Sequence, residues 1–95
     1  MYFKDNFSNY TYISKTTLAN EEILQKKLKE LKPKWTSWCA KKVSINVDKD
    51  CIVKVNGDEL LIRADLGFNT EPWDKDIFSL VTVTPDVNLF AVIGY

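Results

Sequence analysis

The sequence predicts an α+β domain that is mainly antiparallel β, a sandwich-like fold of five or six strands with one amphipathic helix at about residues 21–31. Two observations predict this class. Apolar and polar residues alternate with a period of two in several short segments that turn residues separate, as in half-buried strands. One segment instead has the three- and four-residue spacing of a helix. The chain of 95 residues is predicted to form a single domain, with residues 1–9 as a flexible N-terminal arm.

The first two predicted elements are an edge strand and the helix. Aromatic and β-branched residues alternate over residues 10–15, which indicates an edge or arm strand. In the following segment, NEEILQKKLKELKPK, Asn20 is predicted to cap the helix and Pro33 to stop it. The apolar stripe of this helix consists of Ile23, Leu24, Leu28 and Leu31. The polar face therefore carries Lys26, Lys27 and Lys29.

The remainder of the chain is predicted to be β. Strands are expected at residues 43–47, 51–55, 60–64, 77–84 and 89–93. Asn56-Gly57 is a hairpin signal, because both central residues of a type I′ turn need a positive φ that this pair adopts at little cost. The segment 77–84 is apolar on both faces, which predicts a strand that is central in its sheet or covered by another element.

The composition argues against catalysis and against a metal or cofactor site. The chain has no histidine, the commonest general base and metal ligand. Cys39 and Cys51 lack Cys-x-x-Cys spacing and are predicted to be reduced, although a disulfide stays open if the strand of Cys51 lies beside Cys39. The acidic pairs of the chain have the spacing of ordinary turns. We therefore predict no catalytic residue, no cofactor and no metal.

Charge is distributed unevenly along the chain. Residues 1–42 contain nine basic and four acidic residues, and residues 43–95 contain four and nine. This asymmetry has three readings: a basic arm for nucleic acid, unlike-charged faces that bring copies together, or a lysine-rich helix with a solvated side. In the segment 32–42, Trp35 and Trp38 alternate with lysines and could stack on bases, but the favoured interpretation is that they anchor the helix exit to the sheet.

Several motifs of the second half resemble small virion-associated structural modules of tailed bacteriophages. The shared order is an Asn-Gly turn in VNG, then ADLGF, DIFSLV and a final FAVIGY. The resemblance covers residues 52–95 and is carried by the order of the motifs. It implies a structural role in the particle, in the tail, baseplate, head decoration or fibre attachment. It implies no catalytic residues.

The leading hypothesis is therefore a non-enzymatic component of a phage particle, made in the host cytoplasm and located in the virion. Its partners would be copies of itself and other virion proteins, without a membrane. A host-surface glycan bound by exposed aromatics such as Trp73 is the alternative, and nucleic acid bound by residues 32–42 is a weaker third. The predicted interface residues are Phe68, Trp73, Phe78, Leu80, Phe90, Val92, Lys26, Lys27 and Lys29.

Overall fold

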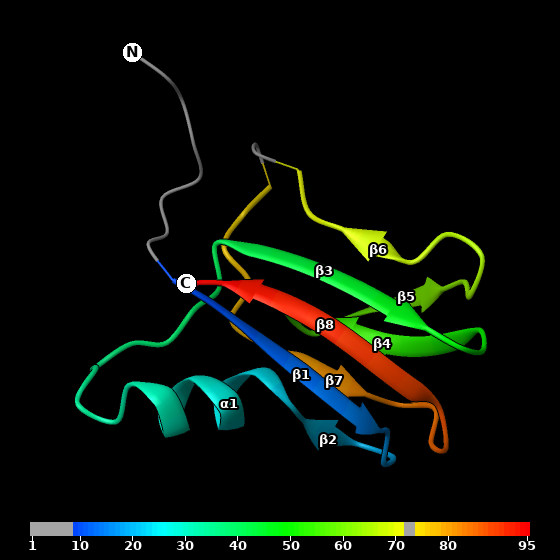
Figure 1. The fold of residues 1–95 in the computed structure, drawn as a ribbon, viewed down its shortest axis with the longest axis horizontal. Helices are drawn as coiled ribbons and strands as arrows, with labels where there is room; N and C mark the ends of the chain where they lie inside the picture. Colours follow the sequence, from blue (N-terminus) through cyan, green and yellow to red (C-terminus); the bar gives the residue numbers. More distant parts are fainter. Residues whose placement is uncertain (1–8, 72–73) are drawn as a thin grey trace.

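The computed structural model describes residues 9–71 and 74–95, which form two four-stranded antiparallel sheets and one short helix (Figure 1). Sheet A has the strand order β1-β8-β3-β6, and sheet B has the order β2-β7-β4-β5. The elements in chain order are β1 (Tyr10–Thr16), β2 (Glu21–Glu22), α1 (Leu24–Leu31), β3 (Lys42–Val47), β4 (Cys51–Val55), β5 (Asp58–Ile62), β6 (Phe68–Asn69), β7 (Leu80–Thr82) and β8 (Asn88–Gly94).

Sheet A is built around β8, which pairs with β1 on one side and with β3 on the other (Figure 1). The period-two patterns of the three strands are aligned by this register, so their apolar residues face the same way. Ile13, Ala91 and Ile45 lie opposite one another across the three strands, and all three are buried. The alternate residues of each strand are on the outward face, where all except the buried Gly94 are at least partly exposed.

Sheet B contains the Asn56-Gly57 hairpin that the sequence predicts. β4 and β5 pair directly on either side of this turn, with Val55 opposite Asp58. Asn56 and Gly57 have φ values of 51° and 89°, the positive values that a two-residue hairpin requires. Because the turn is this tight, β5 begins at Asp58, two residues before the predicted strand.

The helix begins later than the sequence predicts, because the first part of the predicted helix is strand β2. Asn20 is not the N-cap; it has a φ of 57° in the turn that precedes β2. Glu22 supplies the capping oxygen instead, and its Oε2 accepts the N–H groups of Leu24 (3.0 Å) and Gln25 (3.3 Å). Leu24 and Leu28 are fully buried, whereas Leu31 is 37% exposed, so the apolar stripe is shorter than predicted.

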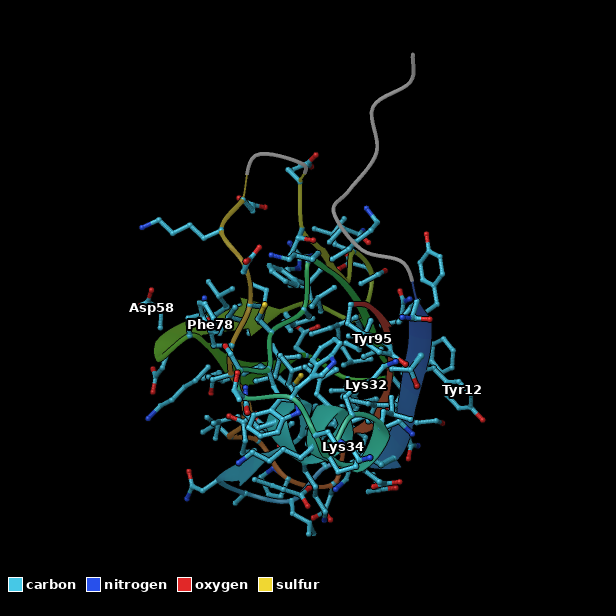
Figure 2. The ribbon with its side chains drawn as sticks, turned by 90° about the vertical axis from the view of Figure 1, so that its left-hand side faces the viewer. Tyr12, Lys32, Lys34, Asp58, Phe78 and Tyr95 are labelled. Carbon is cyan, nitrogen blue, oxygen red and sulfur yellow. The ribbon has the colours of Figure 1, made fainter. Side chains whose placement is uncertain are left out.

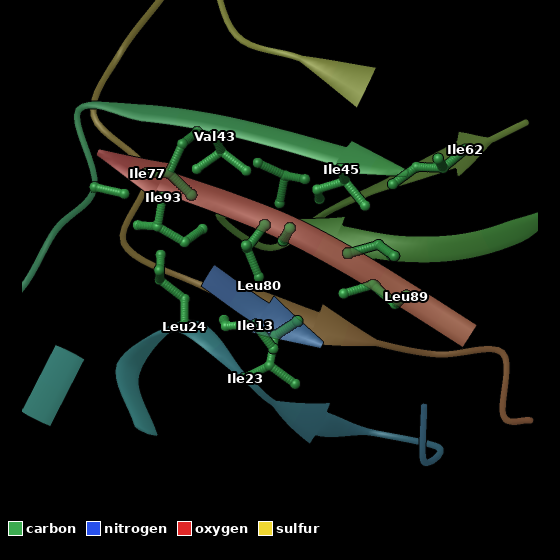
Figure 3. Close-up of a cluster of buried hydrophobic side chains, with 14 of the residues drawn as sticks. Ile13, Ile23, Leu24, Val43, Ile45, Ile62, Ile77, Leu80, Leu89 and Ile93 are labelled. Atoms are coloured by element: carbon green, nitrogen blue, oxygen red, sulfur yellow. The ribbon is translucent and has the colours of Figure 1, made fainter. Parts of the chain in front are cut away.

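Side chains from both sheets and from the helix form one hydrophobic core (Figure 3). Sheet A contributes Val43, Ile45 and Ile93, and sheet B contributes Val53 and Leu80. This arrangement confirms the predicted fold class, an α+β protein made mainly of antiparallel strands. The described residues form eight strands where five or six were predicted, and two of the eight, β2 and β6, have only two residues each.

Strand β6 depends on a glycine. Gly67 has a φ of 68°, and a Cβ atom at this position would lie 2.6 Å from the Ile45 carbonyl oxygen. The missing side chain lets Phe68 and Asn69 pair with β3 beside it. In the described part of the chain, no helix has the length and apolar character needed to cross a membrane.

Candidate functional site

The outward face of sheet A is the most distinctive surface of the molecule. Since Ile13, Ile45 and Ala91 face the core, the residues that alternate with them face outward. At the centre of this face, Tyr12 of β1 lies opposite Val92 of β8, which lies opposite Ser44 of β3. The described outward residues of the four strands are Tyr10, Tyr12, Ser14, Thr16, Lys42, Ser44, Asn46, Asn69, Asn88, Phe90, Val92 and Gly94.

Two of the three aromatic rings on the described part of this face stack on each other at its centre. The Tyr12 and Phe90 rings stack with their centroids 5.8 Å apart and their planes 25° from parallel. Tyr12 is 60% exposed and Phe90 is 44% exposed, so the stack is open to solvent. Rings held in this way have lost much of their freedom before any partner binds, which lowers the entropy cost of using them as contacts.

The rest of the face is uncharged apart from one end. Of its described outward residues, the only charged one is Lys42, which stands in the terminal pair opposite Gly94. The other polar side chains are hydroxyls and amides. A carboxylate lies just beyond the opposite end, where Asp48 Oδ2 accepts the Asn88 Nδ2–H (2.9 Å). Hydrogen bonds from the backbone N–H of Asn88 hold the pKa of Asp48 below its ordinary value.

The predicted interface residues do not form one surface. Phe90 and Val92 lie together on the outward face of sheet A. Phe68 is half-buried and packs against the core. Phe78 is 50% exposed, but Figure 2 shows it on the opposite side of the molecule from Tyr12. Trp73 lies outside the described residues.

Leu80 has to be removed from the predicted interface. It is completely buried, because β7 lies inside sheet B and turns this residue toward sheet A.

The three predicted helix lysines do not lie together on one surface. Lys26 and Lys27 line a groove beside β1, whereas the Lys29 ammonium lies 5.3 Å from the centre of the Trp38 ring.

Tyr10 and Tyr12 are the site residues that the sequence reasoning missed. Both were recognised as part of an edge strand, but only the pairing of β1 with β8 brings Tyr12 to Phe90, 78 positions later in the chain. The signal for them was the Tyr-x-Tyr spacing, which puts both rings on one face of a strand. Without the register, that face could not be assigned to solvent or core.

Trp38 anchors the helix exit, as the favoured interpretation predicts, whereas Trp35 is 39% exposed. Trp38 packs against the core, and its Nε1–H donates to the Lys32 carbonyl oxygen (2.9 Å). Trp35 meets Tyr95 edge to face at 6.1 Å between ring centres. The Lys32 ammonium lies about equally close to both of those rings (5.7 Å and 5.9 Å; Figure 2 labels Lys32 and Tyr95). These rings already contact the protein's own lysines, which leaves less of them for stacking on bases.

The cysteines have the properties of structural thiols. Both are free, and Cys51 is buried in the core. Burial raises the pKa of the Cys39 thiol, and neighbouring Asp76 acts in the same direction. Asp76 is itself held by the Lys41 ammonium at 2.6 Å. A nucleophilic cysteine needs a lowered pKa, so this environment is unsuited to thiolate chemistry. In residues 9–71 and 74–95, no cluster of metal-ligating side chains is arranged to hold an ion.

Asn56 has a second function besides its turn. Its Oδ1 accepts the N–H groups of Phe78 (2.7 Å) and Ser79 (3.2 Å), and its Nδ2–H donates to the Asp76 carbonyl oxygen (3.0 Å). The hairpin therefore holds the segment that leads into β7. The VNG stretch positions backbone and contributes no reactive group.

Comparison with known proteins gives no relative for this chain: no family model, no curated protein and no solved structure matches it.

Proposed function

We propose that this chain is a non-enzymatic structural component of a bacteriophage particle that binds copies of itself and other virion proteins. The observation that carries the proposal is the aromatic outward face of sheet A, with the exposed Tyr12–Phe90 stack at its centre and, among the described residues, its one charge at the end, on Lys42. The resemblance of residues 52–95 to phage virion modules supports the particle as its place of action, in the tail, baseplate, head decoration or fibre attachment.

A face of this composition suits protein contacts for an energetic reason. The centres of protein interfaces are depleted in charged residues and enriched in aromatic ones. Burying a charge costs several kcal/mol unless a partner pairs with it, and this face has its one charge at its end. A partner could therefore cover Phe90 and Val92 without burying a charged residue of this face, whereas the Lys27 ammonium lies 6.0 Å from the centre of the Tyr12 ring. Each buried ring removes about 150–250 Å² from water.

A charge placed in the centre of the face tests the proposal. We expect Phe90→Lys to prevent self-association of the purified chain, measured by sedimentation velocity over a concentration series. The matched control is Leu61→Lys, which puts the same charge at a 65% exposed leucine on sheet B and should leave association unchanged. Mass spectrometry of purified virus particles from cells that carry the gene should also detect the chain. A wild-type chain that stays monomeric at high concentration and is missing from such particles would refute the proposal.

The same face also favours one alternative, a carbohydrate-binding module. Sugar rings stack on exposed aromatic faces, and the exposed amide of Asn46 lies within the face, where it could bond hydroxyls. Under this alternative, wild-type protein would give signals on a glycan array that Tyr12→Ala abolishes and Leu61→Ala retains. An array without signal would exclude it.

A further inference from the structure

Strand β1 lies at one edge of sheet A, and no other described strand pairs with its outer side. Asn9 and Tyr95 exchange both backbone hydrogen bonds, at 3.1 Å and 2.9 Å. In an antiparallel ladder such pairs recur at every second residue, so Thr11, Ile13 and Lys15 bond to β8. The N–H and C=O groups of the residues between them, Tyr12 and Ser14, therefore point away from the sheet.

β1 is also the longest strand at any sheet edge. The opposite edge of sheet A is β6, with two residues, and one edge of sheet B is β2, also with two. The other edge of sheet B is β5, which begins with the exposed acids Asp58 and Glu59. Proteins protect sheet edges by shortening or charging them. β1 has seven residues, and its one charged side chain, Lys15, is paired with Glu21.

A groove runs between this edge and the helix (Figure 1 shows β1 and α1 side by side). It has a volume of about 330 Å³, and one wall is four consecutive residues of β1, from Tyr12 to Lys15. The other wall comes from Ile23, Lys26, Lys27 and Glu30, whose spacing of three, one and three puts them on one face of the helix. A single extended chain would meet backbone on one side and side chains on the other.

The groove favours a negatively charged occupant. Its lining contains three lysines, Lys15, Lys26 and Lys27, against one acid, Glu30. Lys26 is 72% exposed and lies 3.7 Å from Glu21, which Lys15 also contacts. Lys27 lies over the Tyr12 ring at 6.0 Å and has no carboxylate within ion-pair distance among the described residues. An occupant with acidic side chains could pair with both helix lysines.

We propose that this groove binds an extended acidic segment of a partner protein, which adds to β1 as a fifth strand of sheet A. Backbone bonds to Tyr12 and Ser14 would supply affinity, and the helix lysines would select acidic side chains. Tyr12 and Ser14 belong to both surfaces, but strand addition uses the backbone edge of β1 and the helix lysines, whereas the proposed function uses outward side chains. The proposal therefore goes beyond the proposed function and has its own test. The hydrogen bonds to β1 come from uncharged backbone groups, whereas the preference for acidic side chains comes from the helix lysines. Backbone bonding and charge can therefore be changed in separate variants.

The probe is a labelled peptide matched in length to β1, in which valine and glutamate alternate, and binding is followed by fluorescence anisotropy. We expect it to bind more tightly than the same peptide with lysine in place of glutamate, and the difference should shrink as salt is raised. Two further peptides carry N-methyl groups on the odd-numbered or on the even-numbered amides. One of them should lose binding and the other should keep it, because only every second residue of an added strand bonds to β1. If the two methylated peptides bound equally well, strand addition would be wrong.

Two variants of the protein separate backbone from charge. Ser14→Pro removes the outward N–H while leaving the bonds to β8, and proline is tolerated on edge strands at such positions. It should weaken binding about ten-fold, whereas the matched control Ser14→Ala, which keeps the N–H, should not. Lys26→Glu with Lys27→Glu should reverse the preference toward the lysine peptide. Thermal unfolding verifies that each variant folds.

The remaining outcomes also decide the matter. If neither peptide binds the folded wild-type chain, the proposal fails. If the wild-type chain self-associates and Ser14→Pro prevents this while Phe90→Lys does not, the occupant of the edge is a second copy, and the acidic-segment proposal is wrong. Loss of association by Phe90→Lys alone concerns the proposed function and leaves the groove unaffected.

Discussion

The outward faces of the two sheets differ although their inward faces are alike. Inside, both sheets present aliphatic residues to one shared core. Outside, sheet A has the Tyr12–Phe90 stack among hydroxyls and amides, whereas sheet B places the charges of Lys54 and Glu59 among the aliphatic residues Ile52, Leu61 and Val81. Lys54 of β4 lies opposite Glu59 of β5, an opposite-charge pair of the kind that stabilises a solvated sheet. Sheet B also exposes Leu61, beside this pair.

The difference teaches where functional information resides in a small sandwich. Inward positions are constrained by packing and would look much the same whatever the protein binds. Outward positions can carry charge, as Lys54 and Glu59 of sheet B do, whereas the described centre of the sheet A face carries exposed aromatic rings and no charged residue. This composition favours the interpretation that the sheet A face contacts a partner. The comparison can be tested by changing the inward and outward residues of the two sheets in turn.

The largest expected effect is the difference in stability between a variant at an inward residue and a variant at an outward residue. Leu80→Ala should lower the free energy of unfolding by about 3–4 kcal/mol, since it opens a cavity at a completely buried position. Phe90→Ser, on the outward face of sheet A, should cost only about 1 kcal/mol, mainly for the lost stack with Tyr12. Urea denaturation measures both. Equal costs would mean that Phe90 serves the fold, which would remove the reason to regard it as a contact residue.

A smaller effect is expected from the carboxylate that organises one end of sheet B. Glu22 caps the helix, and its Oε2 also accepts the Leu80 N–H at 3.0 Å, while Ser79 donates its hydroxyl to Oε1. Glu22→Ala should cost about 2 kcal/mol, because hydrogen bonds to a charged acceptor are lost and their donors are left without a partner. The matched control is Glu30→Ala on the exposed side of the helix, which should change stability by less than about 0.5 kcal/mol. Equal effects would show that Glu22 is not a structural acceptor.

Glu22 also shows what could not be read from the sequence. Its capping role places it before the helix, whereas its position in a helical pattern predicted it inside the first turn. The β2–β7 pairing that fixes it joins segments about sixty positions apart, with Glu22 opposite Val81. Local pattern cannot reveal such a partner. The hairpin at Asn56-Gly57 could be predicted because its cause, a positive φ at two adjacent residues, is entirely local.

The candidate site was predictable only in part for the same reason. The period-two pattern of the sequence predicted strand β8, which contains Phe90 and Val92. Where both faces of a strand are apolar, however, this pattern does not show which face is exposed to solvent. Leu80 was assigned to the interface because of this ambiguity, which the stacking of the two sheets resolves. Tyr12 needed the β1–β8 register, which depends on contacts between the two ends of the chain.

The smallest effect concerns the ion pair that joins the two sheets, between Lys15 of β1 and Glu21 of β2. The hydrogen bond from Lys15 lowers the pKa of Glu21 below its ordinary value of 4.5. A carboxyl group with a lower pKa in the folded chain stabilises it above the unfolded pKa, and this contribution disappears as the pH falls through the folded pKa. The free energy of unfolding should therefore decrease below about pH 4.5.

Glu21→Gln isolates this contribution from that of other acids. Near neutral pH the variant should be less stable by about 0.5 kcal/mol, since a pair that water still reaches contributes little, and at acid pH it should match the wild type. Urea midpoints measured across this pH range test the prediction. Asp48→Asn is the matched control, because the pKa of Asp48 is also lowered, chiefly by the backbone of Asn88, without a link between β1 and β2. Added salt should reduce the Glu21 effect more than the Asp48 effect, because screening acts on a pair of charges more strongly than on a hydrogen bond to a neutral donor. If salt reduced both equally, the link between the sheets would not be electrostatic, and β1 would be held at its edge by packing and by its ladder with β8 alone.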